Sequence, residues 1–147
     1  MEGARACPDR LAGMLRSRRR RDWSVALVAD AVAVLVFVLI GRANHHESTG
    51  VPGIWHTAWP FLVGAALGLA LTAYTRARPT SIRAGVRVWV WTLVIGMVLR
   101  SATGGGTDPA FLVVAAIVLG VFLVGWRAAL LWRTWRTWHS WRPRRTH

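Results

Sequence analysis

Two arginines end long apolar runs and could together bind an anion. Arg42 and Arg100 each stand at such an end, and His45 and a glycine turn follow nearby. Guanidinium groups bond phosphates and carboxylates in pairs, and free backbone N–H groups at helix starts favour anions. We predict a candidate anion site made of Arg42, His45, Arg100, Gly104, Gly105 and Gly106. The alternative is that both arginines only reach the lipid interface and the glycines form a short turn.

One acid, Asp30, interrupts the first apolar run, residues 23–41. An unpaired charge within a membrane costs at least about 2.5–3.5 kcal/mol, so Asp30 needs a partner or a proton. Counted inward from Arg42 and Arg100, Asp30 and Arg87 lie 12 and 13 residues deep, so their depths differ by about 1.5 Å. We predict an Asp30–Arg87 pair in the bundle interior, and a proton-carrying Asp30 is the alternative. The next donors would be Thr92, Trp89 and Trp91.

The sequence contains no recognisable catalytic motif and no typical metal-ligand spacing. There is no Gly-x-Ser-x-Gly, no pair of neighbouring carboxylates and no phosphate loop with lysine. The single cysteine, Cys7, excludes a disulfide framework. Adjacent histidines rarely point at one ion, and His45, His46 and His56 lack a helical ligand spacing. We expect no enzymatic activity, no metal and no cofactor.

Four apolar stretches must position these residues. The 147-residue chain is 54% hydrophobic and 17% charged, against about 45–50% and about 25% in soluble domains. Each stretch is just long enough to cross a hydrocarbon core of about 30 Å as a helix. The second run is expected to carry Pro60 in its first turn. The predicted fold is an all-α bundle of four transmembrane helices, at about 23–41, 59–75, 84–101 and 109–126.

Arginine placement predicts the orientation of these helices. All 19 basic residues are arginines, and they concentrate in residues 1–22, in 76–87 and from 127 onward. Because cytoplasmic segments carry the excess of basic residues, we expect both termini in the cytoplasm. The candidate anion site then faces outward. A cleaved signal segment is the weaker reading of the first run, which contains Asp30 and no small-residue cleavage site.

The C-terminal tail, residues 127–147, has the pattern of an interfacial amphipathic helix. Tryptophans recur at every third position and sweep one half of a helix, with arginines on the opposite arc. We expect the tryptophans among lipid headgroups and the arginines near anionic lipid, at about 1 kcal/mol per basic residue. Nucleic acid is not an expected partner, because membrane proteins already carry this arginine excess. The residues concerned are Trp132, Trp135, Trp138, Trp141, Arg133 and Arg136.

Small residues mark candidate helix-packing faces. Gly64 and Gly68 share one face of the second helix, and Ala116 and Gly120 share one face of the fourth. Such faces let helix backbones approach closely in membranes. We expect the second and fourth helices to pack against each other, and a homo-oligomer interface is the alternative.

The residues that punctuate the spans resemble a known family. The strings are Phe37-x-x-x-Gly41-Arg42-x-x-His45, Trp59-Pro60-Phe61-x-x-Gly64, Trp91-Thr92-x-x-x-Gly96-Met97-x-Leu99-Arg100, Gly106-Thr107-x-x-Ala110-Phe111 and Gly125-Trp126-Arg127. Together they resemble the actinobacterial membrane proteins grouped as domain of unknown function 3054, over about residues 30–127. The resemblance implies a small integral membrane protein without an assigned activity, and it supplies no catalytic residues.

Two classes of function follow. The first is a non-enzymatic structural or interaction component of the bacterial cytoplasmic membrane, which meets lipids or neighbours through its helix faces and basic tail. The second is a small oligomeric transporter or a module that binds an anion or a lipid headgroup. A closed outer end filled by side chains would favour the first class, whereas a solute between Arg42 and Arg100 would favour the second.

Overall fold

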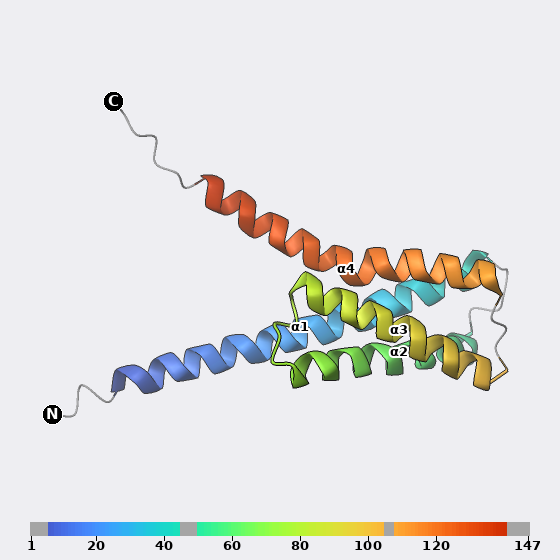
Figure 1. The fold of residues 1–147 in the computed structure, drawn as a ribbon, viewed down its shortest axis with the longest axis horizontal. Helices are drawn as coiled ribbons and strands as arrows, with labels where there is room; N and C mark the ends of the chain where they lie inside the picture. The colour runs from blue at the N-terminus through green and yellow to red at the C-terminus, as the bar shows by residue number, and fades with distance from the viewer. Residues whose placement is uncertain (1–5, 45–49, 105–107, 141–147) are drawn as a thin grey trace.

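The computed structural model is a bundle of four long helices and describes residues 6–44, 50–104 and 108–140 (Figure 1). Side chains are described for 13–43, 50–104 and 108–136. These residues contain no strand, so the predicted all-α class is confirmed. Each helix includes a segment long and apolar enough to cross a membrane, as expected. The helices are α1 (Ala6–Asn44), α2 (Val51–Tyr74), α3 (Ile82–Ala102) and α4 (Pro109–Ser140).

The second helix begins earlier than the sequence suggests. It starts at Val51 with Pro52 in its first turn, and Pro60 lies buried inside it. The expectation that Pro60 stands in the first turn is therefore wrong. Proline lacks a backbone N–H and is well placed at a helix start, a role that Pro52 fills here. An interior proline is tolerated in apolar helices of this kind, because neighbouring groups satisfy the freed carbonyl.

Short polar caps begin the third and fourth helices. The Ser81 hydroxyl accepts a hydrogen bond from Ala84 N at 3.2 Å, which satisfies an N–H group at the start of α3. Asp108 Oδ1 accepts one from Ala110 N at 2.8 Å at the start of α4. Between α2 and α3 the chain turns at Arg76, whose φ is +53°. The same connection contains Pro79, which is buried.

The helices form a ring in chain order. α1 packs against α2 and α4, and α3 packs against the same two helices. Within the described residues, the backbones of the diagonal pairs, α1 with α3 and α2 with α4, do not approach closely. Parallel helices are therefore diagonal and antiparallel helices are adjacent. This ring order determines which side chains can pair.

Three phenylalanines meet in the half of the bundle towards the C-terminal end of α1, where Phe37 and Phe61 are buried and Phe111 is partly buried. The Phe37 and Phe61 rings meet edge to face, with centroids 5.5 Å apart. Phe111 packs against both, at 6.1 and 6.4 Å. Gly96 makes room for the cluster, because a Cβ built there would lie 2.5 Å from Phe61 Cδ1. Aromatic contacts thus join α1, α2 and α4 and occupy the space between the diagonal helices.

Two helical extensions leave the bundle from the same end. Figure 1 shows the N-terminal part of α1 and the C-terminal part of α4 diverging beyond the helical body. Residues 6–22, expected as a tail, belong to α1, and residues 127–140 continue α4 without a break. Around the body, large apolar side chains such as Val32, Val98 and Val121 are more than half exposed. A lipid environment suits such an apolar exterior, which a soluble monomer would bury.

Candidate functional site

Asp30 points from α1 into the bundle, where two neighbouring side chains of α4 hold its carboxylate. Arg127 donates from Nη1 to Oδ1 and from Nη2 to Oδ2, both at 2.8 Å. Trp126 Nε1 also donates to Oδ1, at 3.0 Å. The side chains of Arg127 and Asp30 are 0% and 1% exposed. Such a two-point, charge-assisted pair is strong and fixes the orientation of both groups.

The remaining contacts of Arg127 tie further elements to this pair. Its Nε donates to Pro79 O at 2.9 Å, in the turn between α2 and α3. Its Nη1 also donates to Leu123 O at 2.6 Å, one turn back along α4. The guanidinium carbon lies 4.3 Å from the centroid of the Trp126 ring, at cation–π distance. A Cβ at Gly85 would lie 2.8 Å from Arg127 Cδ, so α3 provides the necessary space.

The direction of helical side chains explains how Arg127 reaches an acid within the span. Cα–Cβ bonds tilt towards the N-terminus of a helix. From Arg127, at the foot of the α4 span, the side chain therefore runs back along α4 towards the interior, as its bond to Leu123 O records. Asp30 faces it from the adjacent antiparallel helix. The pair closes the bundle near the turn between α2 and α3.

The predicted pairing of Asp30 with Arg87 is wrong. Arg87 Nη1 donates instead to Thr75 Oγ1 at 2.7 Å, beside the turn after α2. Equal depth does not make two residues neighbours, and α1 and α3 are diagonal in the ring. Two of the alternative donors bond elsewhere: Thr92 Oγ1 donates to Val88 O at 2.7 Å, and Trp89 Nε1 donates to Ala116 O at 2.9 Å.

Sequence reasoning therefore missed Arg127, although a signal was present. The string Gly125-Trp126-Arg127 carries both side chains that bind Asp30, and α4 is the antiparallel neighbour that closes the ring. The sequence pattern places Arg127 instead at the start of the predicted interfacial segment, residues 127–147. Arg127 is the largest fully buried side chain among the described residues.

The two arginines of the candidate anion site are engaged by different helices. Arg42 Nη1 donates to Thr57 Oγ1 of α2 at 3.1 Å. Arg100 lies over the Phe111 ring near the start of α4, with its guanidinium carbon 4.7 Å from the centroid. Gly104 has a φ of +77°, which suits a turn. His45, Gly105 and Gly106 lie outside the described residues, so the complete anion site stays a prediction.

Metal ligands do not gather in the described part of the chain. Within it, no group of three or more His, Cys, Asp or Glu side chains has the closeness that a metal ion needs. His45, His46 and Glu47 again lie outside the described ranges.

The small-residue faces contact α3 rather than each other. A Cβ at Gly64 would lie 2.8 Å from Thr92 Cα, and one at Gly68 would lie 2.7 Å from Val88 Cα. On α4, a Cβ at Gly120 would lie 3.2 Å from Trp89 Nε1, which donates to Ala116 O. The expected packing of the second helix against the fourth is therefore wrong. Both small-residue faces exist, but the ring order places α3 between them.

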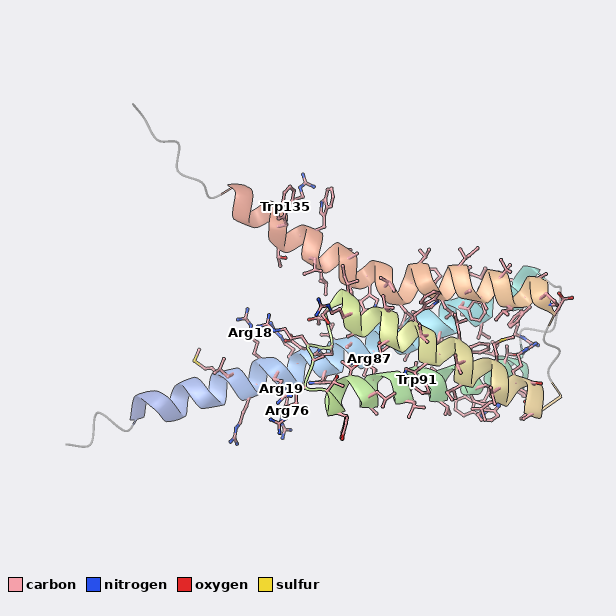
Figure 2. The ribbon with its side chains drawn as sticks, viewed as in Figure 1. Arg18, Arg19, Arg76, Arg87, Trp91 and Trp135 are labelled. Carbon is pink, nitrogen blue, oxygen red and sulfur yellow. The ribbon has the colours of Figure 1, made fainter. Side chains whose placement is uncertain are left out.

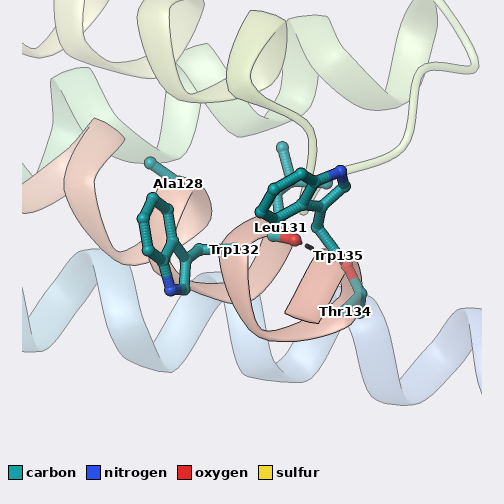
Figure 3. Close-up of a pocket in the computed structure, with 5 residues that line it drawn as sticks. All are labelled: Ala128, Leu131, Trp132, Thr134 and Trp135. Atoms are coloured by element: carbon teal, nitrogen blue, oxygen red, sulfur yellow. Dashed lines mark hydrogen bonds between the residues drawn. The ribbon is translucent and has the colours of Figure 1, made fainter. Parts of the chain in front are cut away.

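The C-terminal extension of α4 carries exposed aromatic rings. Trp132 and Trp135 are 61% and 59% exposed, with ring centroids 6.3 Å apart. They line a shallow hollow with Ala128, Leu131 and Thr134, in which the Thr134 hydroxyl donates to Leu131 O at 2.8 Å (Figure 3). Arg133 and Arg136 are also exposed. The side chain of Trp138 and the whole of Trp141 lie outside the description, so the full amphipathic pattern stays a prediction.

Comparison with known proteins places the chain in a family. The family model described as protein of unknown function (DUF3054) matches residues 27–130, which include the whole Asp30–Arg127 site. The chain belongs to this family. Comparisons with curated proteins and with solved structures give no match.

Proposed function

For this member of the DUF3054 family, we propose a non-enzymatic structural or interaction role in the bacterial cytoplasmic membrane. The observation that carries the proposal is the buried, hydrogen-bonded ion pair in the bundle interior. Both oxygens of Asp30 accept hydrogen bonds from α4, and Arg127 is fully buried. A proton-carrying carboxylate must be able to take up and release a proton, whereas this carboxylate is 1% exposed and is held by a guanidinium group. Such a pair serves to hold helices together.

The packing of the other half supports the same proposal. Phe37 and Phe61 are buried in the core, Phe111 packs against both, and Arg100 lies over Phe111. A solute path through one protomer would have to pass this apolar cluster. The surfaces left for function are then the apolar exterior and the two basic extensions.

A small oligomeric transporter, or a module for anions or lipid headgroups, is the second candidate. Arg42 and Arg100 near the ends of α1 and α3 favour it, because both guanidinium groups belong to the same end of the bundle. Their contacts with Thr57 and Phe111 also suit interface anchors. The two roles differ in whether the arginines hold an exchangeable anion.

Reconstituted vesicles separate the two candidates. We expect proton and anion flux through vesicles containing the protein to equal the flux through protein-free vesicles. Asp30→Asn and the double variant Arg42→Gln/Arg100→Gln should leave this background unchanged. A saturable flux in the original protein that is lost in either variant would contradict the structural role and establish transport.

Photocrosslinking in living cells tests the interaction role directly. A photoreactive residue in place of Trp135 samples the exposed extension of α4, and one in place of Val121 samples the exterior of the span. We expect one discrete protein adduct from position 135 and only lipid adducts from position 121. Lipid adducts alone at both positions would reject a protein partner on this extension.

The proposed orientation has both termini in the cytoplasm, because the arginine-rich extensions leave the bundle from one end. In a Cys7→Ser background, we expect Thr103→Cys to react with an impermeant thiol reagent in intact spheroplasts. Thr80→Cys, in the turn between α2 and α3, should react only after lysis. The reverse pattern would invert the topology.

A further inference from the structure

A groove runs along the outside of the bundle between α1 and α2. Its volume is about 680 Å³, and its walls are almost entirely apolar. The α2 wall leaves room because four of its side chains are small, those of Ala65, Ala66, Ala70 and Ala73. Trp23 lies on the α1 wall. Asp30 also lines the groove, so the groove reaches the buried ion pair. We call this feature the α1–α2 groove.

The length of the α1–α2 groove along the helices matches the hydrocarbon thickness of one lipid leaflet. On α2 it extends from Leu62 to Ala73, eleven residue steps, or about 16.5 Å at about 1.5 Å per step. Half of a hydrocarbon core of about 30 Å is about 15 Å. Further along the seam between these helices, Phe37 packs on Phe61. A lipid chain from one leaflet matches this length, whereas a transmembrane helix of a second copy would need a face about twice as long.

Two arginines lie close in sequence to residues that line the groove. Arg20 precedes Trp23 and Ser24 by about one helical turn and so continues the groove-facing side of α1. Arg76 follows Ala73 by three residues, at the turn after α2. Both arginine side chains are exposed. Figure 2 shows Arg19 and Arg76 at the end of the bundle from which α1 extends.

We propose that the α1–α2 groove binds one acyl chain of an anionic phospholipid, whose phosphate lies against Arg20 and Arg76. The apolar walls accept the chain, and each basic residue near the membrane surface attracts an anionic headgroup by about 1 kcal/mol. The acyl chain covers the part of the groove wall at which the buried Asp30 lies. This site does not depend on the proposed structural or interaction role.

Lipid retention tests the headgroup contact. The protein is reconstituted in bilayers of equal phosphatidylglycerol and phosphatidylcholine, released gently, and weighed by native mass spectrometry with its bound lipid. We expect the original protein to retain phosphatidylglycerol in preference, and Arg20→Gln/Arg76→Gln to reduce this preference about thirtyfold. The control Arg18→Gln/Arg83→Gln removes the same charge, but Arg18 lies on the opposite side of α1 from Arg20. The control should keep the preference.

A groove-filling variant tests the chain contact. Ala70→Phe places a ring in the groove, so the variant should retain neither phosphatidylglycerol nor phosphatidylcholine. The control Leu67→Phe places the same ring outside the groove lining and should retain them. Thermal unfolding in lipid-free detergent shows whether each variant is folded. If Ala70→Phe does not fold, the two double arginine variants still test the proposal.

Three results would overturn the proposal. These are full retention in Ala70→Phe, equal losses in the two double arginine variants, and a dimer that Ala70→Phe dissociates. The last result would assign the groove to a second copy of the chain.

Discussion

Arg127→Gln is expected to lower the free energy of unfolding by about 3–5 kcal/mol, because it leaves the Asp30 carboxylate buried without its charge partner. Two of the three hydrogen bonds to that carboxylate come from Arg127, and only the Trp126 bond would remain. Arg127→Lys should also be destabilising, because a single ammonium group cannot bond both carboxylate oxygens and Pro79 O in the same fork geometry. Reversible unfolding of the purified protein in one fixed lipid or detergent environment measures both effects.

The matched control is Arg87→Gln, which removes an arginine from the same end of the bundle. Its side chain is only partly buried, and it loses a bond to Thr75 Oγ1, so we expect a change within about 0.5 kcal/mol. Asp30→Asn combined with Arg127→Gln should be less destabilising than the sum of the single changes, whereas Asp30→Asn combined with Arg87→Gln should be additive. An Arg127→Gln loss no larger than that of Arg87→Gln would refute the structural importance of the pair.

Gly64→Ala is expected to destabilise the protein by about 1–3 kcal/mol through overpacking. The added Cβ would lie 2.8 Å from both Thr92 Cα and Trp91 O. Both atoms belong to the α3 backbone, so no flexible side chain can move aside and the two helices must separate. The seam between α2 and α3 is the most extensive helix contact in the bundle.

Gly125→Ala provides the matched control for this prediction. Gly125 also lies within a helix, but a Cβ there would meet nothing within 4 Å. Alanine is favoured over glycine in a helix by about 0.5–1 kcal/mol, so this variant should be slightly stabilised. Opposite signs for the two variants, measured by the same unfolding assay, would support close backbone approach at Gly64. A stabilised Gly64→Ala protein would contradict it.

Two of the predicted apolar runs lie inside helices of the structure. The apolar runs at 84–101 and 109–126 lie within α3 and α4, and each ends where arginine appears. The start of α2 was missed, because two prolines compete for the first turn and the sequence does not say which one begins the helix. Local polarity cannot place that boundary, since residues 51–58 are mixed in character.

The sequence by itself determined that this is a four-helix membrane protein of the DUF3054 family, with an acid in its first span that needs a partner. The four spans follow from composition and from the length of each apolar run, and the family follows from short residue strings along the chain. Only the tertiary structure decided that the partner is Arg127 and that Gly64 and Gly68 face α3. Pairing depends on which helices are adjacent and on the direction each residue faces around its axis. Counting residues gives depth in the membrane but does not give the order of helices in the ring.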